Sequence, residues 1–265
     1  MSDAAPGLPP AMPATGPAAA PRPVGPLLAG FVLDWAVAMV LLVVVSAGVA
    51  TAWMVARTLA GVAPTGELDP MGQLLAAMAG VLVPALALYF WRRRADAGEC
   101  QRSRQAAARP RTWLLSLLVG AGCFGFATGF SALASALGLE PVPSNLSVVE
   151  AGWQRWPVFL VLFAVLLAPA YEELLFRRVL FGRFLAGGRP WLGLLLSSLA
   201  FALVHEPPGL TANGLAGMLQ LWLVYGVLGA AFAWVYWRTG TLWAALAAHA
   251  LNNALALGSF LAGAA

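Results

Sequence analysis

Two adjacent glutamates, Glu172 and Glu173, stand inside the apolar stretch "APAYEELLFRRVLFGRF", residues 168–184. In a helix, Glu173 and Arg177 are i and i+4, so they share a face and can form an ion pair. Glu172 is rotated by about 100° from Glu173 and need not share that partner. A charge buried in an apolar helix costs several kcal/mol unless it is paired or hydrated. Glu172 is therefore the candidate functional carboxylate, and Glu173 with Arg177 is its candidate supporting pair.

The sequence contains two histidines, and both fall in later apolar segments. His205 ends "FALVH", and His249 begins "HALNN", in which Asn253 follows His249 by one helical turn. Glu172 and His205 lie about 15 and 17 residues from the turn "AGGRP", and His249 and Asn253 about 9 and 13 residues after "RTG". With a rise of about 1.5 Å per residue, antiparallel helices bring these groups to similar depths. We expect Glu172, His205, His249 and Asn253 to form one site, although each could instead hydrogen-bond a neighbouring helix.

The composition indicates a membrane protein that could contain such a site. The chain has 265 residues, of which 61% are hydrophobic and 10% are charged, against about 25% charged in soluble domains. Unpaired backbone groups are too costly in lipid, so the apolar spans should be helices. We predict an all-α polytopic membrane bundle of about seven transmembrane helices. Their expected ranges are 27–56, 71–91, 112–138, 156–183, 190–206, 214–237 and 241–263.

The chain divides by composition into three parts. Residues 1–25 are rich in Pro and Ala and are expected to be a disordered tail. Residues 26–154 should hold three transmembrane helices joined by a basic loop, and residues 155–265 the catalytic core. Asp34, near one end of the first span, is interpreted as a structural residue.

The distribution of arginine predicts the orientation. All fifteen basic residues are arginines, and seven of them lie in the loop "WRRRADAGECQRSRQAAARPRTW". Basic loops face the cytoplasm, so the amino terminus should be cytoplasmic and the carboxyl terminus on the opposite side. The absence of lysine is typical of a GC-rich genome, which favours a bacterial inner membrane. Because the arginines flank apolar spans, they indicate membrane lipid rather than nucleic acid as the partner.

The three motifs together resemble a known family. "EELLFR", "FALVH" and "HALNN" match, in order, the patterns EExxxR, FxxxH and HxxxN of the CPBP (CaaX protease and bacteriocin-processing, or Abi) family, which includes the type II CaaX prenyl endopeptidase. The resemblance covers about residues 155–258. One departure is Arg178, where a glycine is common in the family.

The resemblance implies an intramembrane endopeptidase that acts on a peptide or a lipidated protein tail. Glu172 would be the general base that activates a water, and His205 would hold that water or the substrate carbonyl. His249 and Asn253 would complete the pocket, with Asn253 as an oxyanion donor. The resemblance does not predict the physiological substrate or the oligomeric state.

Two questions stay open at this point. Glu172, His205 and His249 are a His₂Glu set of the kind that binds catalytic zinc, yet they lack the local HExxH spacing of many zinc proteases. We therefore favour a water activated by glutamate, with a zinc-bound water (metalloendopeptidase) as the alternative. The chain could also be a non-catalytic immunity or scaffold protein that keeps the fold. An ion-coupled transporter is a third possibility, but paired helices broken by Gly or Pro in matching halves are not seen.

Overall fold

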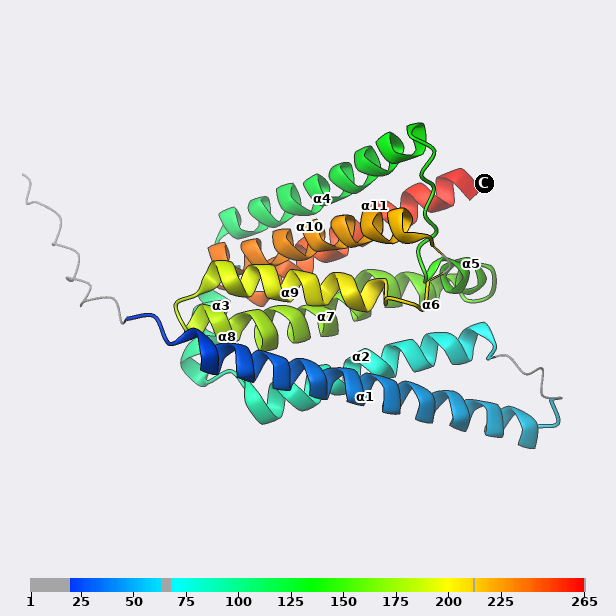
Figure 1. Ribbon diagram of the computed structural model, residues 1–265, viewed down its shortest axis with the longest axis horizontal. Coiled ribbons are helices and arrows are strands. Elements are labelled where there is room, and N and C mark those ends of the chain that lie inside the picture. The colour runs from blue at the N-terminus through cyan, green and yellow to red at the C-terminus, as the bar shows by residue number, and fades with distance from the viewer. Residues whose placement is uncertain (1–19, 63–67, 212, 265) are drawn as a thin grey trace, which may run out of the picture.

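The computed structural model describes residues 20–62, 68–211 and 213–264, and within these residues the regular secondary structure is entirely helical (Figure 1). The predicted all-α class is confirmed. The predicted tail, residues 1–25, lies mostly outside the described residues, and Val24 and Gly25 already belong to the first helix. The elements are α1 (Val24–Leu59), α2 (Pro70–Arg92), α3 (Ala97–Ala107), α4 (Pro110–Ala136), α5 (Leu146–Arg155), α6 (Pro157–Leu162), η1 (Phe163–Leu167), α7 (Ala168–Glu173), η2 (Leu174–Phe181), α8 (Gly182–Ala186), α9 (Pro190–His205), α10 (Leu215–Thr239) and α11 (Leu242–Ala264).

Six helices in the described part of the chain are long and apolar enough to cross a membrane, so the protein is a multi-pass membrane protein. They are α1, α2, α4, the continuous element Pro157–Ala186, α10 and α11. About seven spans were predicted, and the segment predicted at 190–206 is a helix, α9, but it has only 16 residues. At about 1.5 Å per residue it is shorter than the roughly 30 Å hydrocarbon core. It ends at His205 because "EPPG" follows, and proline cannot continue the helical hydrogen bonds.

Two helices were missed because they are polar or short. α3 lies inside the predicted basic loop and begins with a capping box, in which Asp96 accepts the Glu99 N–H and Glu99 accepts the Asp96 N–H. This box satisfies two backbone donors that a helix start otherwise leaves free. α5 precedes the motif-bearing helix and ends at Arg155, just before Pro157.

We call the continuous element Pro157–Ala186 the motif helix, because it carries the two glutamates. It lies between α1 and α2 at one edge of the bundle and α4, α10 and α11 at the other (Figure 1). Phe176, Leu180 and Phe184 pack in one core cluster with residues of α1, α2 and α9, whereas Phe181 packs in a second cluster with α4, α10 and α11. The motif helix is therefore in contact with both sides of the bundle.

Candidate active site

The Glu172 carboxylate lies close to both histidines inside the bundle. The Glu172 Oε2 atom lies 3.6 Å from Nε2 of His205 and 3.8 Å from Nε2 of His249. The side chains are 14%, 20% and 4% exposed, respectively, so the group is largely withdrawn from solvent. The three come from α7, α9 and α11. The equal depth that was predicted from the turn positions is therefore present for Glu172 and the two histidines.

The hydrogen bonds on the far side of each ring define the histidine tautomers. His205 Nδ1 lies 2.9 Å from the Phe201 carbonyl oxygen, and His249 Nδ1 lies 2.9 Å from Glu173 Oε1. Both partners are acceptors, so each Nδ1 carries the hydrogen and donates it. In the neutral rings both Nε2 atoms then hold lone pairs, and both are directed at another acceptor, Glu172. Three acceptors around one point call for a donor between them, such as a water or a bound proton.

Glu173 forms the predicted ion pair with Arg177 and is itself a support for His249. Arg177 Nη2 donates to Glu173 Oε1 at 3.1 Å, and Nε lies 2.8 Å from Oε2, with both side chains fully buried. The guanidinium is surrounded by the rings of three phenylalanines. Its central carbon lies 5.8, 4.9 and 5.7 Å from the ring centres of Phe176, Phe201 and Phe232. Cation–π attraction to these rings and the Glu173 carboxylate together hold Arg177. Arg177 in turn fixes the Glu173 carboxylate, which orients His249.

Asn253 is held by hydrogen bonds to groups other than Glu172 and the two histidines. Its Nδ2 donates to the Ala164 carbonyl at 2.9 Å, and its Oδ1 accepts from Asn252 at 3.1 Å. Among the described residues no hydrogen bond joins Asn253 to Glu172 or to either histidine. Asn253 is thus anchored to the motif helix about two turns before Glu172, with one N–H of its amide left to donate.

Proline explains why the Ala164 carbonyl is free. The Ala168 N–H bonds the Phe163 carbonyl, five residues back, in the wide η1 turn. Pro169 has no N–H, so the next donor of that turn is missing. A second wide segment, η2, follows the two glutamates directly, and such π segments occur frequently at functional sites. Pro169 is visible in the sequence, but the wide turn that it helps to form is not predicted by the sequence pattern.

Aromatic rings, of which only Phe201 belongs to a motif, pack against the two histidines. The His205 ring lies between Phe201 and Tyr225, with centroid distances of 4.2 and 4.7 Å. The His249 ring stacks on Phe232 at 4.6 Å, with 17° between the planes. Tyr225 and Phe232 belong to α10, which carries no motif, so the sequence offered no signal for them.

Glu206 was also missed, although it directly follows His205. Its carboxylate is fully buried and accepts from Asn213 at 3.0 Å and from the Ser144 N–H at 3.3 Å, while Trp222 donates to its backbone carbonyl at 2.7 Å. Ser144 also donates to the His205 carbonyl at 2.9 Å. This network fixes the end of α9, and with it the position of His205.

The donor types of the Glu172 site suit zinc, and their spacing is somewhat wider than in a closed zinc site. Tetrahedral bonds of about 2.0–2.1 Å would hold neighbouring ligand atoms about 3.3 Å apart, whereas the nitrogens lie 3.6 and 3.8 Å from the Glu172 oxygen. Within the described residues no group of three His, Cys, Asp or Glu side chains is arranged to hold a metal ion.

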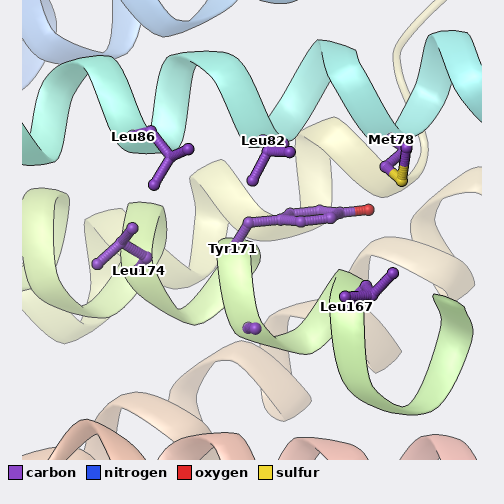
Figure 2. A pocket seen from close by; sticks show the side chains of 7 residues that line it. Met78, Leu82, Leu86, Leu167, Tyr171 and Leu174 are labelled. Carbon is purple, nitrogen blue, oxygen red and sulfur yellow. The ribbon is translucent and has the colours of Figure 1, made fainter. Parts of the chain in front are cut away.

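An apolar groove of about 280 Å³ lies on another face of the motif helix, between it and α2 (Figure 2). Its lining includes Met78 and Leu82 of α2 and Tyr171 and Leu174 of the motif helix. The Tyr171 ring lies in this groove, next to Leu82 and Met78 (Figure 2). The lining contains no carboxylate or imidazole, so the groove is distinct from the Glu172 site.

The geometry describes a multi-pass helical membrane protein with a buried Glu–His–His site. Residues 154–255 match the family model described as "Type II CAAX prenyl endopeptidase Rce1-like". The family resemblance inferred from the three motifs is thereby confirmed for this segment, which contains all seven residues that the motifs fix.

A curated relative agrees with this. Over 114 residues the chain is 27% identical to "Putative membrane peptidase YdiL" of Bacillus subtilis (strain 168), a match that covers 43% of this chain and 40% of the relative. The chain thus spans less than half the length of the curated relative that it matches. No solved structure matches the chain.

Proposed function

We propose that the protein is an intramembrane endopeptidase of the CaaX-processing type, which hydrolyses a peptide bond in a membrane-associated tail. The observation that carries this proposal is the convergence of three acceptor atoms, Glu172 Oε2 and the Nε2 atoms of His205 and His249, at 3.6 and 3.8 Å. A water bound there would donate to two of them and keep a lone pair for attack. The match to a peptidase family supports the same chemistry.

In the proposed reaction Glu172 is the general base. The water oxygen attacks the scissile carbonyl carbon while one water proton passes to the Glu172 carboxylate, and His205 Nε2 accepts the hydrogen bond from the other. The tetrahedral intermediate then collapses with cleavage of the C–N bond, and Glu172 returns its proton to the leaving nitrogen. The products are a carboxyl group and an amine, so the balance needs only water.

The remaining residues would orient these groups. Glu173, held by Arg177, keeps the hydrogen of His249 on Nδ1. The free N–H of the Asn253 amide is the candidate donor to the oxyanion, as the family resemblance implies. Tyr225 and Phe201 would restrict the plane of the His205 ring.

The test compares cleavage of a quenched-fluorescent CaaX peptide, with and without a farnesyl group, by purified protein in detergent. Glu172→Gln is nearly isosteric and should reduce turnover by at least about 10²-fold, because general-base catalysis supplies roughly 10²–10⁴. The matched control is Glu150→Gln, an exposed glutamate that should leave turnover unchanged. Wild-type turnover in a correctly inserted Glu172→Gln protein would reject Glu172 as the general base. Absence of cleavage by the wild type itself would favour the non-catalytic scaffold.

A chelator arm of the same assay addresses the metal. Activity that persists in chelator supports the water activated by glutamate. Activity that is lost in chelator and restored by zinc would replace that mechanism with the zinc-bound alternative, with Glu172, His205 and His249 as the ligands.

A further inference from the structure

A second cluster of charged side chains lies at one end of the bundle, away from the Glu172 site. It joins α1, the end of α2, α3 and the second half of the motif helix. Four arginines face two carboxylates, so its net charge is 4 − 2 = +2. The members, which we call the arginine cluster, are Asp34, Arg92, Arg93, Glu99, Arg178 and Arg183.

Both carboxylates of the cluster are already engaged. Asp34, only 1% exposed, accepts from Arg92 Nε at 2.8 Å and from Arg183 Nη2. Glu99 accepts two hydrogen bonds from Arg178, at 3.0 and 2.6 Å. One buried aspartate therefore serves two arginines, and neither carboxylate is available to another cation.

Two donors of the cluster have no partner. Among the described residues the Arg93 side chain makes no hydrogen bond, and the buried Arg183 Nε also has none. Burial, and then the neighbouring charges of Arg183 and Arg178, lower the pKa of the Arg93 guanidinium. A half-buried cation beside two other cations is costly, so an anion beside Arg93 would stabilise the folded protein.

The surroundings indicate which anion fits. Phe90 and Trp91, immediately before the arginines, are 60% and 67% exposed, and exposed aromatic residues at a helix end mark the membrane interface. The Arg92 guanidinium lies 5.2 Å from the Trp91 ring centre. Lipid phosphates lie at this depth, and arginine pairs with phosphate through two parallel hydrogen bonds.

We propose that Arg93 and Arg183 bind the phosphate of an anionic phospholipid headgroup at the junction of α1, α2 and α8. Arg183 and Arg178 belong to the same motif helix as Glu172. A lipid bound here would therefore connect the amino-terminal helix pair to the helix that carries the site. The proposal does not depend on the proposed peptidase activity.

Native mass spectrometry of the full chain in detergent, titrated with phosphatidylglycerol or phosphatidylcholine, tests this site. We expect preferential retention of phosphatidylglycerol by the wild type and about tenfold weaker retention by Arg93→Gln, since a hydrogen bond to a charged group contributes about that factor. The matched control is Arg94→Gln. Arg94 is exposed, lies 6.0 Å from the Phe90 ring centre and is outside the cluster, so this variant should bind as the wild type does.

Several results would overturn the proposal. Equal retention by the wild type and Arg93→Gln, or an equal loss in Arg94→Gln, would show that binding is not specific to this site. Displacement of the lipid by millimolar inorganic phosphate would indicate a site for free phosphate. Displacement by a free-acid peptide but not by its amidated form would assign the site to a peptide carboxylate.

A measurement on the wild type alone covers the case in which Arg93→Gln does not fold. Phosphatidylglycerol should raise the midpoint of thermal unfolding in detergent, and phosphatidylcholine should not. A ligand that binds the folded state stabilises it, and only the lipid with a net negative charge should bind the arginines tightly. Equal midpoints in the two lipids would contradict a specific anionic site. Neither readout involves cleavage, so failure here leaves the peptidase proposal untouched.

Discussion

The protein buries two clusters of carboxylates and arginines that differ in how they are built. The cluster at Glu173 is local: its arginine follows four residues later on the same helix, and both side chains are fully buried. The arginine cluster at Asp34 is assembled from distant segments, because Arg92 and Arg183 follow Asp34 by 58 and 149 residues. The two arginines that pair with Asp34 are also 26% and 16% exposed. One charged group is thus enclosed in protein, and the other keeps access to the membrane surface.

This difference corresponds to two tasks. The Glu173 pair holds one histidine in one tautomer, which requires a rigid and dry environment. The Asp34 cluster fastens α1 and α2 to the motif helix, and the space for it is provided by Gly30, where a Cβ would lie 2.2 Å from Arg183 Nη1. The comparison predicts that removing a charge from the Glu173–Arg177 pair lowers the stability of the protein more than removing the charge of Asp34.

The largest effect is expected from Arg177→Met, which leaves Glu173 buried without its cation. Breaking a buried ion pair by removing one partner costs about 3–5 kcal/mol, because the remaining charge is neither solvated nor paired. The free energy of unfolding in detergent should fall by this amount, or the protein should fail to accumulate. The double variant Glu173→Gln, Arg177→Met should recover part of the loss. If the double variant were as unstable as the single one, the cost would come from lost packing rather than from the stranded charge.

A smaller effect is expected from Asp34→Asn, about 1–3 kcal/mol, the cost of a weakened charge-assisted hydrogen bond. Arg92 and Arg183 lose their carboxylate but can still reach water, because both are partly exposed. The same unfolding measurement applies. As a control, Glu140→Gln at an exposed position should stay within about 0.5 kcal/mol of the wild type. A larger loss for Asp34→Asn than for Arg177→Met would reverse the comparison between the two clusters.

Local patterns predicted most of the fold and the centre of the site. Hydrophobic runs gave the long helices with ends only a few residues from those observed, as in 71–91 against Pro70–Arg92. Helical spacing alone distinguished Glu172 from the ion pair of Glu173 and Arg177. The number of residues between each group and the nearest turn correctly predicted that both histidines lie beside Glu172. These inferences succeed because they depend on the geometry of one helix or one hairpin.

The remaining features depend on contacts between distant segments or on backbone irregularities. Nothing near Asp34 in the sequence indicates Arg183, and α10 has no motif that would identify Tyr225 or Phe232 as the rings beside the histidines. The wide η1 turn that exposes the Ala164 carbonyl to Asn253 arises from Pro169 together with packing. A pattern in one segment cannot predict such features, because the partner is supplied by the rest of the fold.

The smallest effect is expected at Glu99, the solvent-facing member of the arginine cluster. The hydrogen bonds from Arg178 chiefly lower the pKa of this carboxyl from 4.5 to about 2. A carboxyl whose pKa is lowered by folding stabilises the folded protein above its unfolded pKa, and this contribution disappears as the pH falls through the folded pKa. The stabilisation by Glu99 should therefore be complete above about pH 5 and decline between about pH 4.5 and pH 2.

Glu99→Gln isolates this contribution, because glutamine can still complete the capping box with Asp96. Near neutral pH the variant should unfold at a slightly lower temperature than the wild type, and the difference should shrink as the pH approaches 2. Because the Glu99 side chain is 37% exposed, the shift should be well below that of Asp34→Asn. The difference between the two midpoints cancels the titration of all other groups, and Glu150→Gln supplies the baseline for an exposed glutamate without an arginine partner. A difference that stayed constant from pH 7 to pH 2.5 would contradict a contribution that depends on the Glu99 charge, and the arginine cluster would then be held to the motif helix by Asp34.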